Sequence, residues 1–229
     1  MQKHLRILFI IAFFLTGYST LNAQDESSAT DSLSGEIRGI IRHSFIHWMD
    51  PIVPSALVGI DYRIGDRRYL RHELAYIFDL GYEEPQALTS LSGFRLRTAY
   101  RKYHQAPQLR RRLIGYLEFS VDYRYLDVGI DGDFRRDSGN FRQRINYHLW
   151  QHSVSLNLLA GMTVPIGAKW RADFGIGGGV RLNHRRYSEV PDDALFITNG
   201  VWYLWNYDSR ADYSFAISMP IILALCYQW

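Results

Sequence analysis

The sequence predicts an all-β fold, namely an eight-stranded antiparallel up-and-down transmembrane β-barrel that is preceded by a cleaved signal peptide. Three observations predict it: an export signal at the N-terminus, a series of segments in which apolar and polar residues alternate, and short and long connections that alternate between those segments. No segment beyond the signal supplies the about 20 mainly apolar residues that a transmembrane helix needs. Any crossing of a membrane is therefore expected to use strands.

Residues 1–23 have the pattern of a secretory signal peptide. Basic residues that include Lys3 precede an apolar run over 7–15, and Asn22-Ala23 forms a small-residue cleavage region before Gln24. The apolar run is too short to span a membrane. No cysteine follows it, so a lipid anchor is not expected.

The mature chain is expected to have a disordered lead-in over 24–34, which is polar, and one barrel domain over 35–229. The lone cysteine, Cys226, cannot form an internal disulfide. The formal net charge of +3 is spread along the chain without a block of lysine or arginine. This distribution predicts no nucleic-acid partner.

Seven segments before the C-terminal one set an apolar row against a row that carries charge. They are 37–45, 56–64, 70–80, 94–101, 112–125, 153–164 and 170–182. The period of two predicts strands, and one apolar face with one polar face is typical of strands between lipid and a polar interior. His72 interrupts the apolar row of its segment.

The last segment, 213–229, has the clearest alternation of all. Its apolar row is Tyr213, Phe215, Ile217, Met219, Ile221, Leu223, Leu225, Tyr227 and Trp229. Helical spacing fails over this stretch, so we expect one continuous strand.

The connections between these segments alternate in length. Short turns are expected at 65–66, 105–108 and 165–167, and longer loops around 50–54, 82–92, 127–140 and 183–210. Outer-membrane barrels join strands by short periplasmic turns and longer external loops. Eight strands then place both mature termini on the periplasmic side.

The polar rows would bring opposite charges together inside the barrel. The inward residues are Arg38, Arg42, Arg63, Arg71, Arg95, Arg97, Arg101, Arg112, Arg124, Arg171 and Arg181, with Glu36, Asp61, Glu73, Asp79, Glu118, Asp122 and Asp173. Side chains fill an eight-stranded barrel, so we expect a lumenal charge network that plugs it. The alternative is a small porin-like channel for anions or another ligand.

No cofactor or metal site is expected. The glycines in 175–179 resemble a dinucleotide loop, but Val180 replaces the last glycine and no helix follows. The aspartates in 127–137 do not have the spacing of a calcium-binding loop. Inward glycines and a solvated loop are the simpler interpretations.

A lipid-modifying barrel enzyme is the alternative from another functional class. A lipid A deacylase or acyltransferase needs a nucleophile, a base and an orienting acid within mutual reach. His152 and Ser153 are the nearest candidates, but adjacent strand residues point to opposite faces. We therefore expect a protein that is not an enzyme.

The last external loop contains a hairpin signal and three aromatic residues. Asn199-Gly200 favours a two-residue turn, and its arms are too short to cross the bilayer. Trp202, Trp205 and Tyr207 either pack in the interfacial aromatic belt or form a surface patch that binds an extracellular protein or glycan.

The Asn22-Ala23-Gln24 region, the strand Val58–Arg63 with its tight turn, and the C-terminal strand that ends in Trp229 resemble small porin-family barrels of the OmpA-transmembrane and OmpX type. The resemblance covers nearly the whole mature chain. It implies the outer membrane of a Gram-negative bacterium, insertion by the barrel-assembly machinery, and contact with outer-membrane lipid and lipopolysaccharide. The expected role is envelope structure or surface interaction through the external loops.

A soluble lipocalin-like carrier is a third interpretation. It needs apolar residues inside and polar residues outside. Burial separates the two: the membrane barrel requires Phe119, Phe174 and Leu223 outside, and Arg97, Glu118 and Arg171 inside.

Overall fold

The computed structural model describes residues 39–44, 54–79, 88–104, 113–166, 169–188, 190–191, 193–196 and 213–228. The predicted signal peptide and lead-in lie outside the described residues. So do the predicted Asn199-Gly200 hairpin, the aromatic residues Trp202, Trp205 and Tyr207, and the final Trp229.

The described residues form strands and one short 3₁₀ turn, so the all-β prediction is confirmed. The strands are β1 (Gly39–Ser44), β2 (Ser55–Gly65), β3 (Arg68–Phe78), β4 (Leu88–Tyr103), β5 (Ile114–Arg136), β6 (Phe141–Pro165), β7 (Trp170–Tyr187), β8 (Leu195–Phe196), β9 (Tyr213–Ser218) and β10 (Ile221–Gln228). The 3₁₀ turn η1 is Asp137–Gly139. No helix in the described part of the chain is long and apolar enough to cross a membrane.

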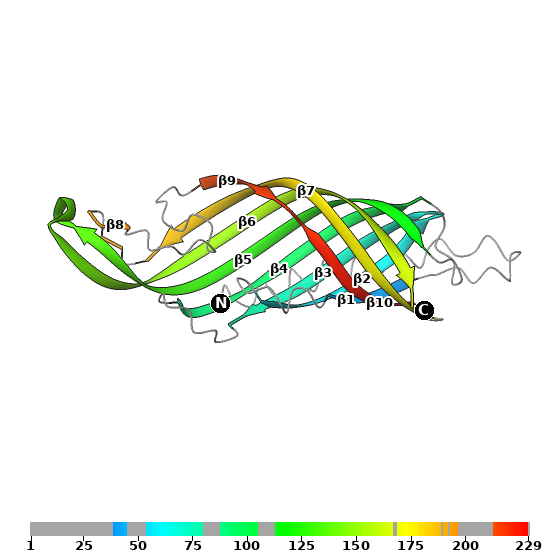
Figure 1. Ribbon diagram of the computed structural model, residues 1–229, viewed down its shortest axis with the longest axis horizontal. Helices are drawn as coiled ribbons and strands as arrows, with labels where there is room; N and C mark the ends of the chain where they lie inside the picture. Colours follow the sequence, from blue (N-terminus) through cyan, green and yellow to red (C-terminus); the bar gives the residue numbers. More distant parts are fainter. Residues whose placement is uncertain are drawn as a thin grey trace, which may run out of the picture. The chain divides into compact units, whose positions relative to one another are not determined.

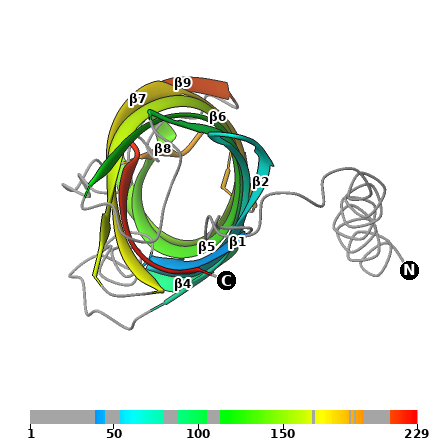
Figure 2. The same cartoon turned by 90° about the vertical axis from the view of Figure 1, so that its right-hand side faces the viewer.

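The strands pair into a closed ring. Each strand from β1 to β7 is antiparallel to the next, and β10 pairs with both β7 and β1. Figure 2 looks along this ring, with β1 beside the C-terminal strand. Because consecutive strands are neighbours, the predicted antiparallel up-and-down order is confirmed, and the β1 and β10 edges satisfy each other.

The C-terminal strand is not continuous, which corrects the prediction for 213–229. It divides into β9 and β10 at Met219-Pro220, because proline has no N–H to donate to a sheet. Both parts pair with β7, and the backbone N–H of Gly177 donates to the carbonyl of Pro220 at 3.0 Å. The alternation therefore continues through the break with the apolar row still outward.

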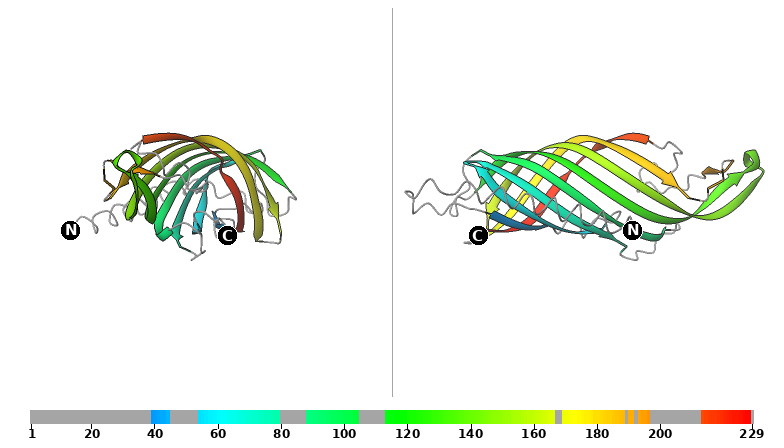
Figure 3. Two further views of the ribbon diagram at one scale, coloured as in Figure 1. Left: turned by 60° about the vertical axis from the view of Figure 1, so that its left-hand side comes forward. Right: turned by 180° about the vertical axis from the view of Figure 1, so that it is seen from behind.

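The predicted loop 127–140 is mostly strand, which is a second correction. β5 has 23 residues and β6 has 25, against 11 each for β2 and β3. Figure 1 and the right view of Figure 3 show this hairpin running beyond the other strands, with β8 paired to β5. We call its distal part, 127–147 with β8, the arm. The end of the ring that carries the β2–β3 turn is called the turn end.

The two faces of the ring differ in chemistry. The apolar residues Phe119 (49% exposed), Phe174 (41%) and Leu223 (38%) lie on the outward face, while Arg97 (4%), Glu118 (1%) and Arg171 (1%) are buried. This distribution is opposite to the one that a carrier of apolar ligands needs at these positions.

Candidate functional site

The interior of the ring holds ion pairs between equal numbers of arginines and carboxylates. This ionic cluster consists of Arg42, Arg71, Arg95, Arg97 and Arg101 with Asp61, Glu73, Glu118, Asp122 and Asp173. Its formal charge is zero. An ionised side chain is buried at tolerable cost only when it is paired and hydrogen-bonded, and each of these residues has at least one such contact.

Asp61 lies at the centre of the ionic cluster and is fully buried. Arg42 donates to its carboxylate through Nε at 3.1 Å and Nη2 at 2.9 Å. Arg71 donates through Nε at 2.9 Å and Nη2 at 3.1 Å. Two guanidinium groups thus bind one carboxylate in the two-pronged geometry that gives the strongest charged hydrogen bonds.

Several of these bonds cross the lumen. Asp173 on β7 accepts from Arg42 on β1 at 2.7 Å and pairs with Arg101 on β4 at 3.0 Å. Neither β1 nor β4 is a sheet neighbour of β7. Arg101 also donates to Glu118 at 2.7 Å, and its guanidinium carbon lies 3.3 Å from the centroid of the Tyr116 ring. The side chains therefore link non-neighbouring strands across the centre of the ring.

The ionic cluster continues along β4 toward the arm. Arg97 donates to Glu118 at 2.6 Å and contacts Glu73 at 3.4 Å, and Arg95 binds Asp122. Asn157 on β6 donates to Asp122 at 2.6 Å. An amide thus replaces a guanidinium as a donor to Asp122 at this edge of the ionic cluster.

The remaining arginines of the predicted network occupy other positions on the strands, and one of them, Arg124, is directly opposite Arg95 of the ionic cluster. Arg63 contacts Asp66 at 3.2 Å in the β2–β3 turn, and Arg171 is buried opposite Cys226. Arg124 and Arg181 lie nearer the arm, opposite Ser153 and Ser155.

The other charged residues expected inside are placed differently. Asp79 lies just after β3, two residues beyond the buried Ile77, and is exposed, so it is not enclosed in the ring. Glu36, Arg38 and Arg112 lie outside the described residues.

A layer of amides and hydroxyls adjoins the ionic cluster, and the sequence analysis did not identify it. Gln151 donates to the hydroxyl of Ser153 at 2.9 Å, and Ser153 donates to Asn183 at 2.8 Å. Arg185 contacts Gln151 at 3.4 Å. Gln151, Ser153 and Asn183 occupy alternate, inward positions along their strands, as the charged residues do. This period of two is the sequence signal that could have identified them.

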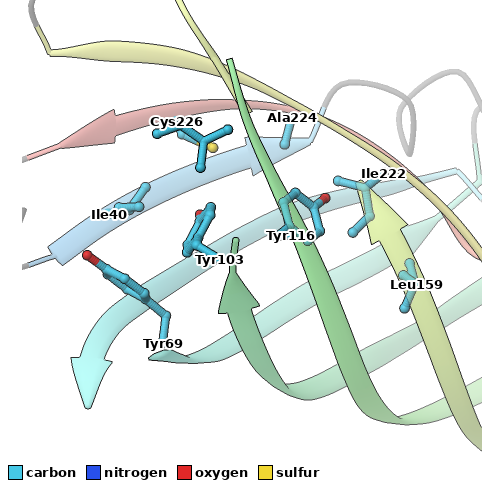
Figure 4. Packing of buried hydrophobic residues seen from close by; sticks show 9 residues of the cluster. Ile40, Tyr69, Tyr103, Tyr116, Leu159, Ile222, Ala224 and Cys226 are labelled. Carbon is cyan, nitrogen blue, oxygen red and sulfur yellow. The ribbon is translucent and has the colours of Figure 1, made fainter. Parts of the chain in front are cut away.

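Apolar clusters lie on both sides of these polar layers. At the turn end, Tyr69, Tyr103, Tyr116, Ile222 and other buried side chains pack together, as Figure 4 shows. Toward the arm, the buried residues are Ile77, Leu91, Leu126, Val128 and Leu149. The interior of the ring is thus layered in the order apolar, ionic, amide and apolar.

The outward apolar rows end toward the arm on aromatic and imidazole rings. Phe94, Tyr125, His152, His184 and Tyr213 are partners on successive strands. Successive ring centroids are 5.8, 5.0, 6.1 and 4.7 Å apart. Amphipathic rings at the edge of an apolar surface are typical of the boundary between hydrocarbon and water.

The candidate catalytic pair does not meet. His152 points outward, and the hydroxyl of Tyr123 lies 2.8 Å from its Nδ1. Ser153 is buried on the inward face and donates to Asn183. The imidazole and the hydroxyl are therefore on opposite faces of β6 and cannot share a proton directly.

The arm has its own small core and ion pairs. Phe134 and Tyr147 pack with Ala194, and the segment that holds Ala194 continues into β8. Arg136 donates to Asp193 at 2.8 Å, and the backbone N–H of Asp137 donates to the same carboxylate at 3.2 Å. These contacts hold the segment after β7 against the hairpin.

The hydrogen bond from Arg136 lowers the pKa of the Asp193 carboxyl, and the N–H of Asp137 lowers it further. The contribution of this contact to stability is therefore complete above the ordinary aspartate pKa of about 3.9 and is lost as the pH falls through the lowered value. NMR titration of the Asp193 carboxyl in micelles is expected to give a midpoint below the ordinary value. Arg136→Gln should raise that midpoint, and an unchanged midpoint would contradict the assignment.

No family model and no curated protein sequence matches the chain. The crystal structure of Neisserial surface protein A is similar with a TM-score of 0.40 and 11% sequence identity, covering 84% of this chain and 96% of that one. At this level of similarity the strand pairing and burial of the chain itself define its fold.

Proposed function

We propose that the chain is a non-enzymatic integral β-barrel of a Gram-negative outer membrane, with a charge-paired, plugged lumen. It serves envelope structure or surface interaction through its external elements, chiefly the arm. The observation that carries the proposal is the distribution of side chains on the ring, with large apolar residues outward and ion pairs inward.

The outward face supports residence in lipid. Large apolar side chains are more than a third exposed on every strand of the ring, for example Val58, Leu74, Leu158 and Ile176. Soluble monomers rarely expose continuous apolar patches larger than a few hundred Å². Closure of the sheet supports the same conclusion, because β10 pairs with β1 on one side and with β7 on the other, and a bilayer favours paired strand edges.

The orientation follows from the lengths of the connections. Short turns face the periplasm in barrels of this kind, and long loops face outward. The β2–β3 turn would then be periplasmic, together with both mature termini, and the arm would project from the cell. Outer-membrane lipid and lipopolysaccharide are the expected surroundings, and the barrel-assembly machinery would insert the chain.

The contents of the lumen argue against a channel. A conducting path needs room for a hydrated ion, whereas Asp173 on β7 is bonded to Arg42 on β1 and to Arg101 on β4. The separation of His152 from Ser153 argues in the same way against a lipid-modifying enzyme. The arm remains the working element that the geometry favours.

The test combines fractionation with gel mobility and conductance. The protein is expected in the outer-membrane fraction and should migrate anomalously on gels until it is boiled, because a closed sheet resists detergent. Planar bilayers that contain the purified protein should show no single-channel steps. A wholly soluble periplasmic location would overturn the membrane assignment, and regular conductance steps would overturn the plugged lumen.

A further inference from the structure

Four side chains on the outward face of β6 and β7 form a compact polar patch where the apolar rows end. Trp150 and His152 lie on β6, and His184 and Arg186 lie on β7. His152 is directly opposite His184, and Trp150 is directly opposite Arg186. Opposite residues on one sheet face have Cβ atoms about 5 Å apart, and residues two apart along a strand are separated by about 7 Å. We call these four residues the β6–β7 patch.

The side of the patch toward the turn end is apolar. Val154 and Leu182 are the next outward residues there; they are paired with each other and are exposed. Tyr213 flanks the patch with its ring 4.7 Å from that of His184. The patch therefore lies at the edge of the surface that the proposed function assigns to hydrocarbon.

The charge of the patch is positive. Arg186 is exposed, and within the described residues no carboxylate pairs with it. Among the described residues, Asp127 is the acid directly opposite Trp150, and it is contacted by His148, whose Nδ1 lies 3.2 Å from the carboxylate. The imidazoles of His152 and His184 lie beside the guanidinium of Arg186, so N–H groups and one positive charge are close together in the patch.

We propose that the β6–β7 patch binds the phosphate of a phosphorylated glycolipid headgroup in the surrounding leaflet, an inference that rests on the proposed function. Hydrocarbon tails would cover Val154 and Leu182, which places the headgroup at the level of Arg186 and His184. A guanidinium forms strong charge-assisted hydrogen bonds to phosphate, and anionic headgroups attract cations at the membrane surface. Trp150 supplies an amphipathic ring of the kind that favours this interface.

The test measures lipid retention by native mass spectrometry of the full-length mature protein in detergent. The probes are bisphosphorylated lipid A, its dephosphorylated form and phosphatidylethanolamine. Arg186→Gln is expected to weaken binding of the bisphosphorylated lipid about fivefold, the factor that corresponds to roughly 1 kcal/mol for one cation near an anionic surface. Arg186→Lys should keep most of the affinity, because the charge remains.

Arg142→Gln is the matched control, since Arg142 is also exposed on the outward face of β6 but lies on the arm, far along the strand from Val154. It should bind like the wild type. Equal binding of the phosphorylated and dephosphorylated lipids, or no loss in Arg186→Gln, would overturn the phosphate site.

Each variant is also tested for the mobility shift on boiling and for insertion into vesicles. Normal insertion without phosphate selectivity overturns this inference alone, whereas failure of the wild type to insert overturns the proposed function as well.

Discussion

Asp61→Asn is expected to lower the free energy of unfolding by about 3–5 kcal/mol, the usual cost of breaking a buried ion pair by removing one partner. Asp61 is fully buried and accepts four hydrogen bonds from Arg42 and Arg71. Asparagine has a similar shape but no charge, and its NH₂ group would face guanidinium donors. The ionic cluster would also acquire a net charge of +1. Urea unfolding in detergent micelles, followed by tryptophan fluorescence, measures the change.

Asp66→Asn is the control for this experiment. Asp66 is also paired with an arginine, Arg63, at 3.2 Å, but its side chain is 89% exposed. Exposed pairs contribute about 0–1 kcal/mol, so this variant should unfold nearly like the wild type. Equal changes in the two variants would show that the interior is hydrated and that the carboxylate of Asp61 is not required for stability.

Leu158→Arg is expected to destabilise the protein in a bilayer by about 2–4 kcal/mol, the cost of arginine near the middle of the lipid-facing surface. Leu158 is 62% exposed on the outward face of β6, between Phe119 on β5 and Gly178 on β7. In water, an exposed leucine would accept arginine with little change. Reversible unfolding in phospholipid vesicles therefore reports whether hydrocarbon covers this face.

Phe141→Arg is the matched control, because Phe141 lies on the same strand and is 50% exposed, but belongs to the arm. A surface substitution in water changes the free energy of unfolding by about 0.5 kcal/mol or less. A large difference between the two variants is expected. If Leu158→Arg is as well tolerated as Phe141→Arg, the outward face of the ring is in water.

The faces of the strands could be predicted from sequence because strand alternation is a local property. Side chains two residues apart share a face whatever the partner strand is, so Glu118 and Phe119 had to lie on opposite sides of β5. The same rule identified which face of each strand is removed from water, because that face carries the continuous apolar row. The antiparallel order of neighbours followed from the short connections.

The arm could not be predicted from the same pattern. Between residues 127 and 147 both faces of the hairpin carry polar groups, so the alternation of apolar and polar residues is lost. The strands continue there because β5 and β6 pair with each other and because Phe134 and Tyr147 pack against Ala194. Pro220 is present in the sequence of the last strand, but the apolar row continues past it without interruption. The break between β9 and β10 was therefore not predicted.

The sequence by itself determined that this chain forms strands and which side chains share a face, because both depend on backbone geometry over two or three residues. Only the tertiary structure decided which charges meet, as when Asp173 binds Arg42 and Arg101 from strands that are not its neighbours. It also decided that His184 and Arg186 lie beside His152 and Trp150. These contacts depend on strand register and ring closure, which are fixed by pairing between residues far apart in the chain.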